Sequence, residues 1–271
     1  MYYQATPLSE NVMLSQAPSI FATAPHPEVS ERYGFVPTVE VLRNLEREGW
    51  YPVQATQTPV RDAGRFGYAR HKVRLRRLHD HLEMGECVPE LVLTNSHDRS
   101  SAYRLDIGLF RLLCSNGLIV SLGHLGGGIR VRHGRNIVKE VIEGSFQLVE
   151  ELPGVVARVG QFRDMPLTTE EQEAFAEAAL TVRYGEDWRA QSPVGPGQLL
   201  DARRREDAGD DLWGVYNRVQ ENFMKGGLDG RSARTGRRVR TRGIRGIQED
   251  LRLNRALWVL AERIAELKEA T

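Results

Sequence analysis

The stretch at residues 68–78, YARHKVRLRRL, alternates between basic and mostly apolar side chains. Neighbouring side chains of a β-strand point to opposite faces of its sheet, so this period of two predicts a strand. One predicted face carries the basic residues Arg70, Lys72, Arg74 and Arg76, and the other carries Ala69, His71, Val73 and Leu75. We expect the second face to be buried.

The period of two continues on both sides of this strand, over residues 51–133. Turn signals divide the region into short β-rich runs, and they are Asp62-Ala63-Gly64, Met84-Gly85, Asn95–Ser101 and Gly126-Gly127-Gly128. We therefore predict an antiparallel meander of about five strands.

Helical spacing takes over on either side of the meander. Residues 37–49 are predicted to form a helix that Thr38 caps and Gly49 ends, with Val41, Leu42 and Leu45 on one face. Two more helices are predicted at residues 135–152 and 168–185. Helices that follow an antiparallel sheet cover its apolar face, so the pattern predicts an α+β fold.

Three regions are expected along the chain. Residues 1–33 are rich in proline and small polar residues, which predicts an irregular N-terminal arm that can tie one subunit to a neighbour. Residues 34–190 are expected to form the α+β core. The break QSPVGPGQ begins the C-terminal region, residues 191–271, which holds a basic loop at 230–246 and a final helix.

Charge and composition limit the class of protein. The chain has 37 basic and 36 acidic residues and a net charge of +1, so the positions of the charges must identify a partner. Apolar runs fall short of the ~20 residues of a bilayer span, and the start lacks a secretion-signal pattern. Cys87 and Cys114 are too few for a disulfide framework, so we expect reduced thiols and a cytoplasmic protein.

The basic face of the predicted strand is the first candidate site. Its residues Arg70, Lys72, Arg74 and Arg76 recur every two positions, about 6.6 Å apart, which roughly matches the phosphate repeat of an extended single strand. Four like charges in a row repel one another, which favours an anionic partner. The alternative is a solvated face that acidic residues of a neighbouring strand neutralise.

A second candidate site lies near the C-terminus. It carries Arg231, Arg234, Arg237, Arg238, Arg240, Arg242 and Arg245, with no acid between Gly230 and Gln248. Interspersed glycines predict a loop or a hairpin that can fit against a sugar-phosphate backbone. The alternative is a mobile arm that only improves solubility.

Enzymatic signatures are missing from the sequence. We find no phosphate-binding loop, dinucleotide fingerprint, HExxH zinc motif or nucleophile elbow, and we expect no cofactor and no metal. His97 and Asp98 stand in a polar stretch that is typical of a hairpin turn, and a hydrolase built on them is the least favoured interpretation. We therefore expect a protein that acts by binding.

Two motifs connect the chain to a known family. The first is LTNSHDRSSAYRLDIGLFRLLCSNGLIV at residues 93–120, and the second is RTRGIRGIQEDLRLNRALWVLAE at residues 240–262. Both resemble signatures of the phage/plasmid-like protein family of bacteria and mobile elements, a domain of unknown function. The resemblance spans residues 36–267 and implies a bacterial host cell.

A weaker, fold-level similarity is to the Rad-fifty-two-type single-strand annealing proteins. Those proteins place a short helix before a curved antiparallel sheet, back it with a long helix and assemble into rings. The predicted elements at 37–48, 51–133 and 135–152 follow that order. The similarity implies annealing activity but transfers no site residue.

Two functions from different classes follow. The first is a non-catalytic protein that binds single-stranded DNA in recombination or maintenance, as a homo-oligomer and in the manner of a ring. The second is a host-takeover or anti-defence protein that uses the same arginines to bind an acidic protein surface. Salt-dependent binding to an oligonucleotide separates them.

Overall fold

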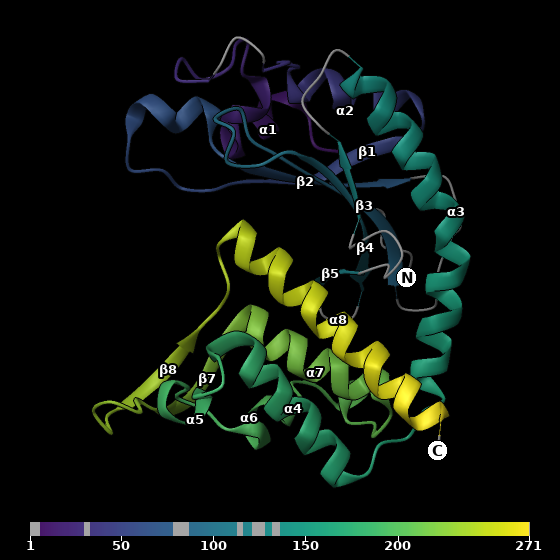
Figure 1. The fold of residues 1–271 in the computed structure, drawn as a ribbon, viewed down its shortest axis with the longest axis vertical. Helices are drawn as coiled ribbons and strands as arrows, with labels where there is room; N and C mark the ends of the chain where they lie inside the picture. Colours follow the sequence, from purple (N-terminus) through teal and green to yellow (C-terminus); the bar gives the residue numbers. More distant parts are fainter. Residues whose placement is uncertain are drawn as a thin grey trace. The chain divides into compact units, whose positions relative to one another are not determined.

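The sheet predicted from the alternating stretch is present in the computed structural model, which describes residues 6–29, 33–77, 87–112, 116–120, 128–131 and 136–270. Its antiparallel strands are β1 (Trp50–Gln57), β2 (His71–Arg77), β3 (Cys87–Asn95), β4 (Tyr103–Arg111), β5 (Asn116–Ile119) and β6 (Ile129–Val131). The order is β1-β2-β3-β4-β5 (Figure 1), and β6 also pairs with β4. The predicted meander and the α+β class are confirmed.

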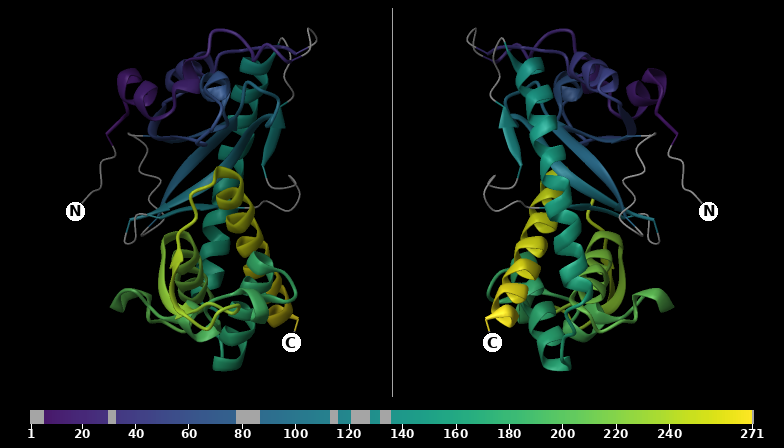
Figure 2. Two further views of the ribbon diagram at one scale, coloured as in Figure 1. Left: turned by 90° about the vertical axis from the view of Figure 1, so that its left-hand side faces the viewer. Right: turned by 90° about the vertical axis from the view of Figure 1, so that its right-hand side faces the viewer.

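The chain divides into two compact units, residues 1–152 and residues 153–271. The division differs from the expected core of residues 34–190. A long helix, α3 (Ile137–Arg163), contains the boundary, because it continues through Pro153 instead of ending near residue 152 (Figure 2). The helix predicted at 168–185 therefore belongs to the second unit.

Strand register gives the sheet of the first unit one apolar face. Val73 pairs with Leu93 and Leu75 with Leu91, and all four side chains are buried. Short helices complete this unit: α2 (Thr38–Arg47) buries Val41, Leu42 and Leu45, as predicted, and η2 (Ala63–Tyr68) precedes β2. The predicted strand phase of His71, Val73 and Leu75 is confirmed.

The N-terminal segment is packed rather than irregular. It forms α1 (Glu10–Gln16), which Ser9 caps, and η1 (Pro18–Phe21). Met13, Ala17 and Ile20 are buried, because this apolar side of the segment lies against the first unit. The expectation of an irregular arm is wrong for residues 10–21, which form two short helices.

The second unit is helical apart from a two-stranded ribbon. Its helices are α4 (Thr169–Tyr184), α5 (Trp188–Gln191), α6 (Pro196–Leu200), η4 (Arg205–Asp207), α7 (Leu212–Lys225) and α8 (Ile247–Glu269), and its strands are β7 (Gly226–Arg231) and β8 (Arg238–Arg242). Helix α7 packs against α4, α6 and α8. Its residues 212–223 are all buried, so it is the centre of this unit.

Some predictions concern parts of the chain that the structure leaves out. The turns at Met84-Gly85 and Gly126-Gly127 and the thiol of Cys114 lie outside the described residues. Cys87 is buried. Over the described part of the chain, no helix has the length and apolar character needed to cross a membrane.

Candidate nucleic-acid interface

The basic C-terminal segment forms an antiparallel β-hairpin from β7 and β8, one of the two forms predicted for it. Glycine permits the backbone conformations that the hairpin needs. Gly226 and Gly227 begin β7 with φ angles of +62° and +80°, and Gly236 has a φ of +67° in the connecting loop. Ser232 N–H donates to the Arg237 carbonyl across that loop at 2.9 Å. The segment is therefore an ordered ribbon.

Main-chain contacts hold the ribbon against the loop that precedes α6. Arg231 N–H donates to the Pro193 carbonyl at 2.9 Å, and the Gln198 amide donates to the Asp229 carbonyl at 2.8 Å. The approach is so close that a Cβ atom on Gly230 would lie 2.1 Å from the Pro193 oxygen. Glycine at position 230 is thus required by the packing.

A second set of bonds anchors the base of the ribbon to the end of α7. Ile244 N–H donates to the Met224 carbonyl at 3.0 Å, and the Arg203 guanidinium donates to the Gly226 carbonyl. Arg203 Nε also donates to Asn222 Oδ1 at 2.7 Å. Both ends of the hairpin are therefore fixed by the helical part of the unit.

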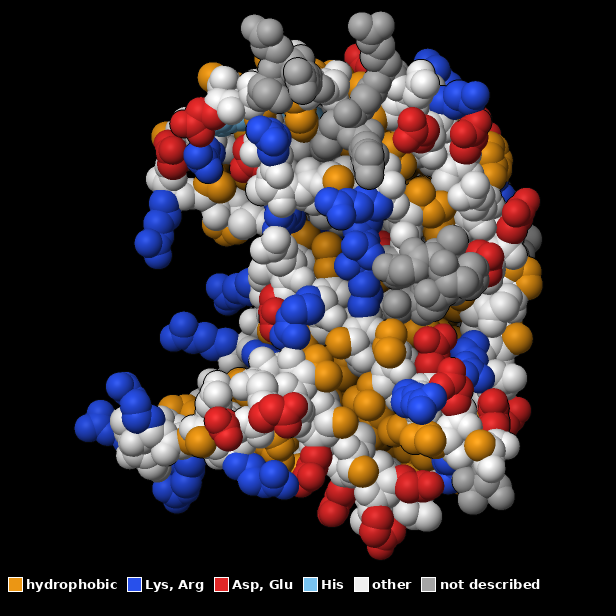
Figure 3. Space-filling model, viewed as in Figure 1, with side chains coloured by type: hydrophobic (Ala, Val, Ile, Leu, Met, Phe, Trp, Pro, Cys, Tyr) orange, Lys and Arg blue, Asp and Glu red, His pale blue; other side chains and the backbone are white. Residues whose placement is uncertain are grey.

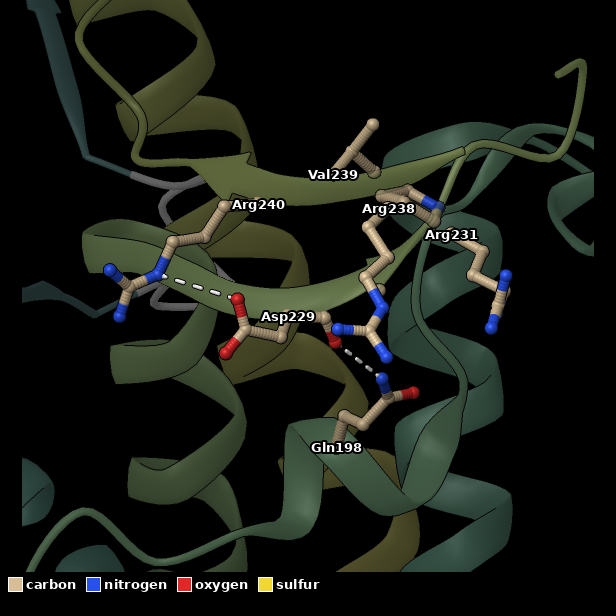
Figure 4. Close-up of a pocket in the computed structure, with 8 residues that line it drawn as sticks. Gln198, Asp229, Arg231, Arg238, Val239 and Arg240 are labelled. Carbon is tan, nitrogen blue, oxygen red and sulfur yellow. Dashed lines mark hydrogen bonds and ion pairs between the residues drawn. The ribbon is translucent and has the colours of Figure 1, made fainter. Parts of the chain in front are cut away.

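Every arginine that the sequence marked in this segment is exposed: Arg231, Arg234, Arg237, Arg238, Arg240, Arg242 and Arg245. The register pairs Arg231 with Arg238 and Asp229 with Arg240, which puts these four side chains on one face of the ribbon. Val239 points from the other face (Figure 4). Basic side chains project from the β7–β8 ribbon in the space-filling view (Figure 3).

The arginine face of the ribbon borders an open cavity of about 910 Å³. It is lined by Pro193 and Gln198 and by the ribbon residues Asp229, Gly230, Arg231, Arg238, Val239 and Arg240 (Figure 4). The lining holds three guanidinium groups and a single carboxylate, and Arg240 Nε lies 3.8 Å from Asp229 Oδ1. The cavity therefore carries an excess of positive charge that suits an anionic ligand.

The basic face of β2 differs from the expectation. Arg74 and Arg76 are only 3% and 5% exposed, and their guanidinium groups lie 2.5 Å and 2.6 Å from the carboxylate of Glu90 on β3. The Arg76 guanidinium also stacks 3.7 Å above the ring of Phe110. The prediction that these two arginines face solvent is wrong, because Glu90 neutralises them inside the protein. The alternative interpretation was right about an acid on a neighbouring strand and wrong about a solvated face.

The other two residues of that row are partly covered. Arg70 donates to the Ser100 carbonyl, and burial lowers the pKa of its guanidinium. Lys72 is half-buried and pairs in register with Thr56 and Thr94 on the neighbouring strands. The row of four charges therefore does not form one exposed track.

His97 and Asp98 are part of a turn, as predicted. The Asp98 carboxylate accepts a hydrogen bond from Ser100 N–H at 2.9 Å. His97 is fully buried, and its Nε2 lies 3.2 Å from the hydroxyl of Thr38. Among the residues that the structure describes, no group of His, Cys, Asp and Glu side chains has the arrangement of a metal site.

The sequence patterns did not identify the cavity residues that lie outside the ribbon. Pro193 and Gln198 belong to the break QSPVGPGQ, which the sequence marked only as a linker. Asp229 was not selected either. Its position one residue before Gly230, at the edge of the basic segment, was the available signal.

Comparison with known proteins places the chain in a family. Residues 25–258 match the family described as Domain of unknown function (DUF932). Two relatives from Escherichia coli strain K12, UPF0380 protein YafZ and UPF0380 protein YfjQ, are each 44% identical over 262 residues, which is 95% of this chain and 92% of theirs. No solved structure matches the chain. The chain belongs to the DUF932 family.

Proposed function

For a member of a family whose description assigns no activity, we propose a non-catalytic role: the protein binds single-stranded DNA through the exposed arginines of the β7–β8 ribbon. The observation that carries this proposal is the concentration of seven exposed arginines in one ordered segment. The cellular role that fits is recombination or maintenance of phage or plasmid DNA, including strand annealing.

The charge pattern supports a phosphate backbone as the partner. Exposed arginines in such numbers repel one another, and the guanidinium group matches the geometry of phosphate oxygens. Asp229 forms a 3.8 Å ion pair with one of them, Arg240. Since surface ion pairs of this kind contribute little, the repulsion is relieved more completely by an anionic ligand.

The arginines of the ribbon supply a part of the binding that does not depend on sequence. Contacts from arginine to phosphate fix the position of a nucleic acid without reading its bases. The resemblance to single-strand annealing proteins is consistent with this mode, because annealing requires a strand to be held by its backbone with its bases available. The same proposal includes self-association of the protein, in the manner of a ring.

Fluorescence anisotropy with a labelled oligonucleotide tests the proposal. We expect log affinity to fall linearly with log salt. Changing Arg238 and Arg240 together to alanine should lower the slope by about 0.7 for each phosphate that the variant no longer neutralises. Arg205→Ala and Lys139→Ala, which remove exposed charges elsewhere, should leave the slope unchanged.

The same experiment distinguishes the alternative function. If no oligonucleotide binds at low salt, the proposal is wrong and the arginines are available for an acidic protein surface, as a host-takeover protein would require. If binding occurs but the ribbon and control variants lower the slope equally, the ribbon is not the site. Mixing complementary strands with the protein then tests annealing directly.

A further inference from the structure

We infer that the cavity beside the ribbon holds an unpaired nucleotide and that Asp229 accepts hydrogen bonds from the amino group of its base. This inference rests on the proposed function and specifies its ligand. It predicts a preference for single strands over duplexes and for bases with an exocyclic amine over thymine.

The Asp229 carboxylate has unused hydrogen-bonding capacity. Its side chain is 91% exposed, and the neighbouring Arg240 Nε donates instead to the Gly227 carbonyl at 2.8 Å. The 3.8 Å separation between Arg240 and Asp229 is too long for a hydrogen bond. Within the described residues, no donor reaches the Asp229 carboxylate at hydrogen-bond distance, so it is available to a ligand.

The main chain holds this carboxylate at the cavity. The Asp229 carbonyl accepts from the Gln198 amide, whose own oxygen accepts from Gly195 N–H at 2.7 Å. The next residue, Gly230, lies against Pro193. The backbone on both sides of the Asp229 Cα is therefore fixed, and the side chain has only its own rotamers to adjust.

A carboxylate on an arginine face is unfavourable for phosphate alone, because like charges repel. It is favourable for a nucleotide, which offers a negative phosphate to the arginines and a donor edge to the acid. Acidic side chains accept from the N4 amine of cytosine, and guanine and adenine present similar donors. Thymine has no amine, and carbonyl oxygens flank its one N–H.

The cavity has the size and openness for this ligand. Its volume of about 910 Å³ lies within the range of about 300–1,000 Å³ that is usual for small-molecule sites. Its arginines, Arg231, Arg238 and Arg240, stand on the same face as Asp229 and can contact the phosphates that flank a bound base (Figure 4). In a duplex, one hydrogen of each such amine is already paired and the other lies within a groove, so an unpaired base presents its donor edge to the acid more fully.

Competition between homopolymers tests the inference. We expect the wild-type protein to bind an oligo-dC at least about fivefold more tightly than an oligo-dT of equal length, the low end of what one base-reading pair contributes. Asp229→Asn should tighten binding to oligo-dT by removing a negative charge and should bring the dC to dT ratio close to one.

Asp187→Asn is the matched control, since it removes the same charge from an exposed position outside the cavity. It should leave the ratio at its wild-type value. Equal wild-type affinity for the two homopolymers, or an Asp229→Asn variant that tightens both and keeps the ratio, would overturn the inference and leave the proposed function intact. If neither homopolymer binds, the proposed function itself is wrong.

Discussion

Individual side chains decide which of the two basic clusters is available to a ligand. In β2, the Arg74 guanidinium occupies space that two glycines leave open. A Cβ atom at Gly117 would lie 2.2 Å from Arg74 Cζ, and one at Gly108 would lie 3.2 Å from Arg74 Nη1. The Glu90 carboxylate lies 2.5 Å from the Arg74 guanidinium, so the positive charge of Arg74 is enclosed within the protein. Arg74 therefore has a structural role.

Glu90 should consequently be essential for stability. It is fully buried between Arg74 and Arg76, so Glu90→Gln removes the carboxylate charge that lies beside two buried guanidinium groups. We expect the free energy of unfolding to fall by about 3–5 kcal/mol. Denaturant unfolding measures this loss. Arg43→Ala, which breaks the exposed pair with Glu10, should cost about 1 kcal/mol or less, and an equal loss from both variants would contradict the prediction.

A buried polar cluster in the same unit links pH to stability. His71 Nδ1 lies 2.8 Å from the Ser19 hydroxyl, and its Nε2 lies 2.8 Å from the Thr38 hydroxyl. Thr38 thus contributes to this cluster and does not cap α2, which was its predicted role, since Pro37 occupies the N-cap position. Burial lowers the pKa of His71 from 6.5 to about 4.

The sign of the pH effect follows from that shift. Between about pH 6.5 and pH 4 the unfolded chain protonates His71 while the folded chain keeps it neutral, so stability falls as the pH falls. The loss of stability is about 2–4 kcal/mol in total: it is zero above about pH 6.5 and complete near pH 4. Denaturant unfolding from pH 7.5 to 4.5 should show a shallower pH dependence for His71→Gln. Parallel curves for the two proteins would be evidence against a neutral buried His71.

At the scale of secondary-structure elements, the ribbon contains a close contact that one substitution would disturb. A methyl group at position 230 would collide with the Pro193 carbonyl, so Gly230→Ala should displace β7 from the loop before α6. We expect a loss of roughly 1–3 kcal/mol in unfolding free energy, typical of overpacking, together with weaker oligonucleotide binding. Gly197→Ala, a helical position with open space, should lower neither quantity. Normal affinity in a destabilised Gly230→Ala variant would show that the cavity is not used.

Strong local signals made several elements predictable. The strand phase of β2, the apolar face of α2 and the end of α4 at Gly185 follow from alternation, helical spacing and turn chemistry. The cap of α4 is an N-terminal capping box in which Thr168 and Glu171 bond reciprocally. Other elements depend on distant contacts. α1 is stabilised by burial of Met13, which local propensity does not reveal.

Sequence patterns were weakest at the candidate site, because its parts come from separate segments. The exposed arginines of the ribbon could be predicted from the glycine-rich basic run, since no acid stands among them. The burial of Arg74 and Arg76 could not be predicted from the sequence, because it depends on the strand register that brings Glu90 beside them. Gln198 reaches Asp229 only after the chain has folded.

At the scale of the whole molecule, each unit has its own apolar core, which predicts two unfolding transitions. The first unit contains Trp50, which is 2% exposed. The second contains Trp188, Trp213 and Trp258, the last of which packs against Phe162 and Tyr216. Tryptophan fluorescence therefore reports both units, and the difference between wild type and Trp50→Phe isolates the first.

We expect substitutions to act on one transition each. Glu90→Gln should lower the midpoint of the transition that Trp50 reports, and Gly230→Ala should lower the midpoint of the other, because each changed side chain lies within one unit. Effects at sites that share no partners normally stay separate. Calorimetry combined with fluorescence measures both midpoints in the intact chain. A single transition that both substitutions lower would show that the two units unfold cooperatively, and the stability of the ribbon would then depend on the sheet as well.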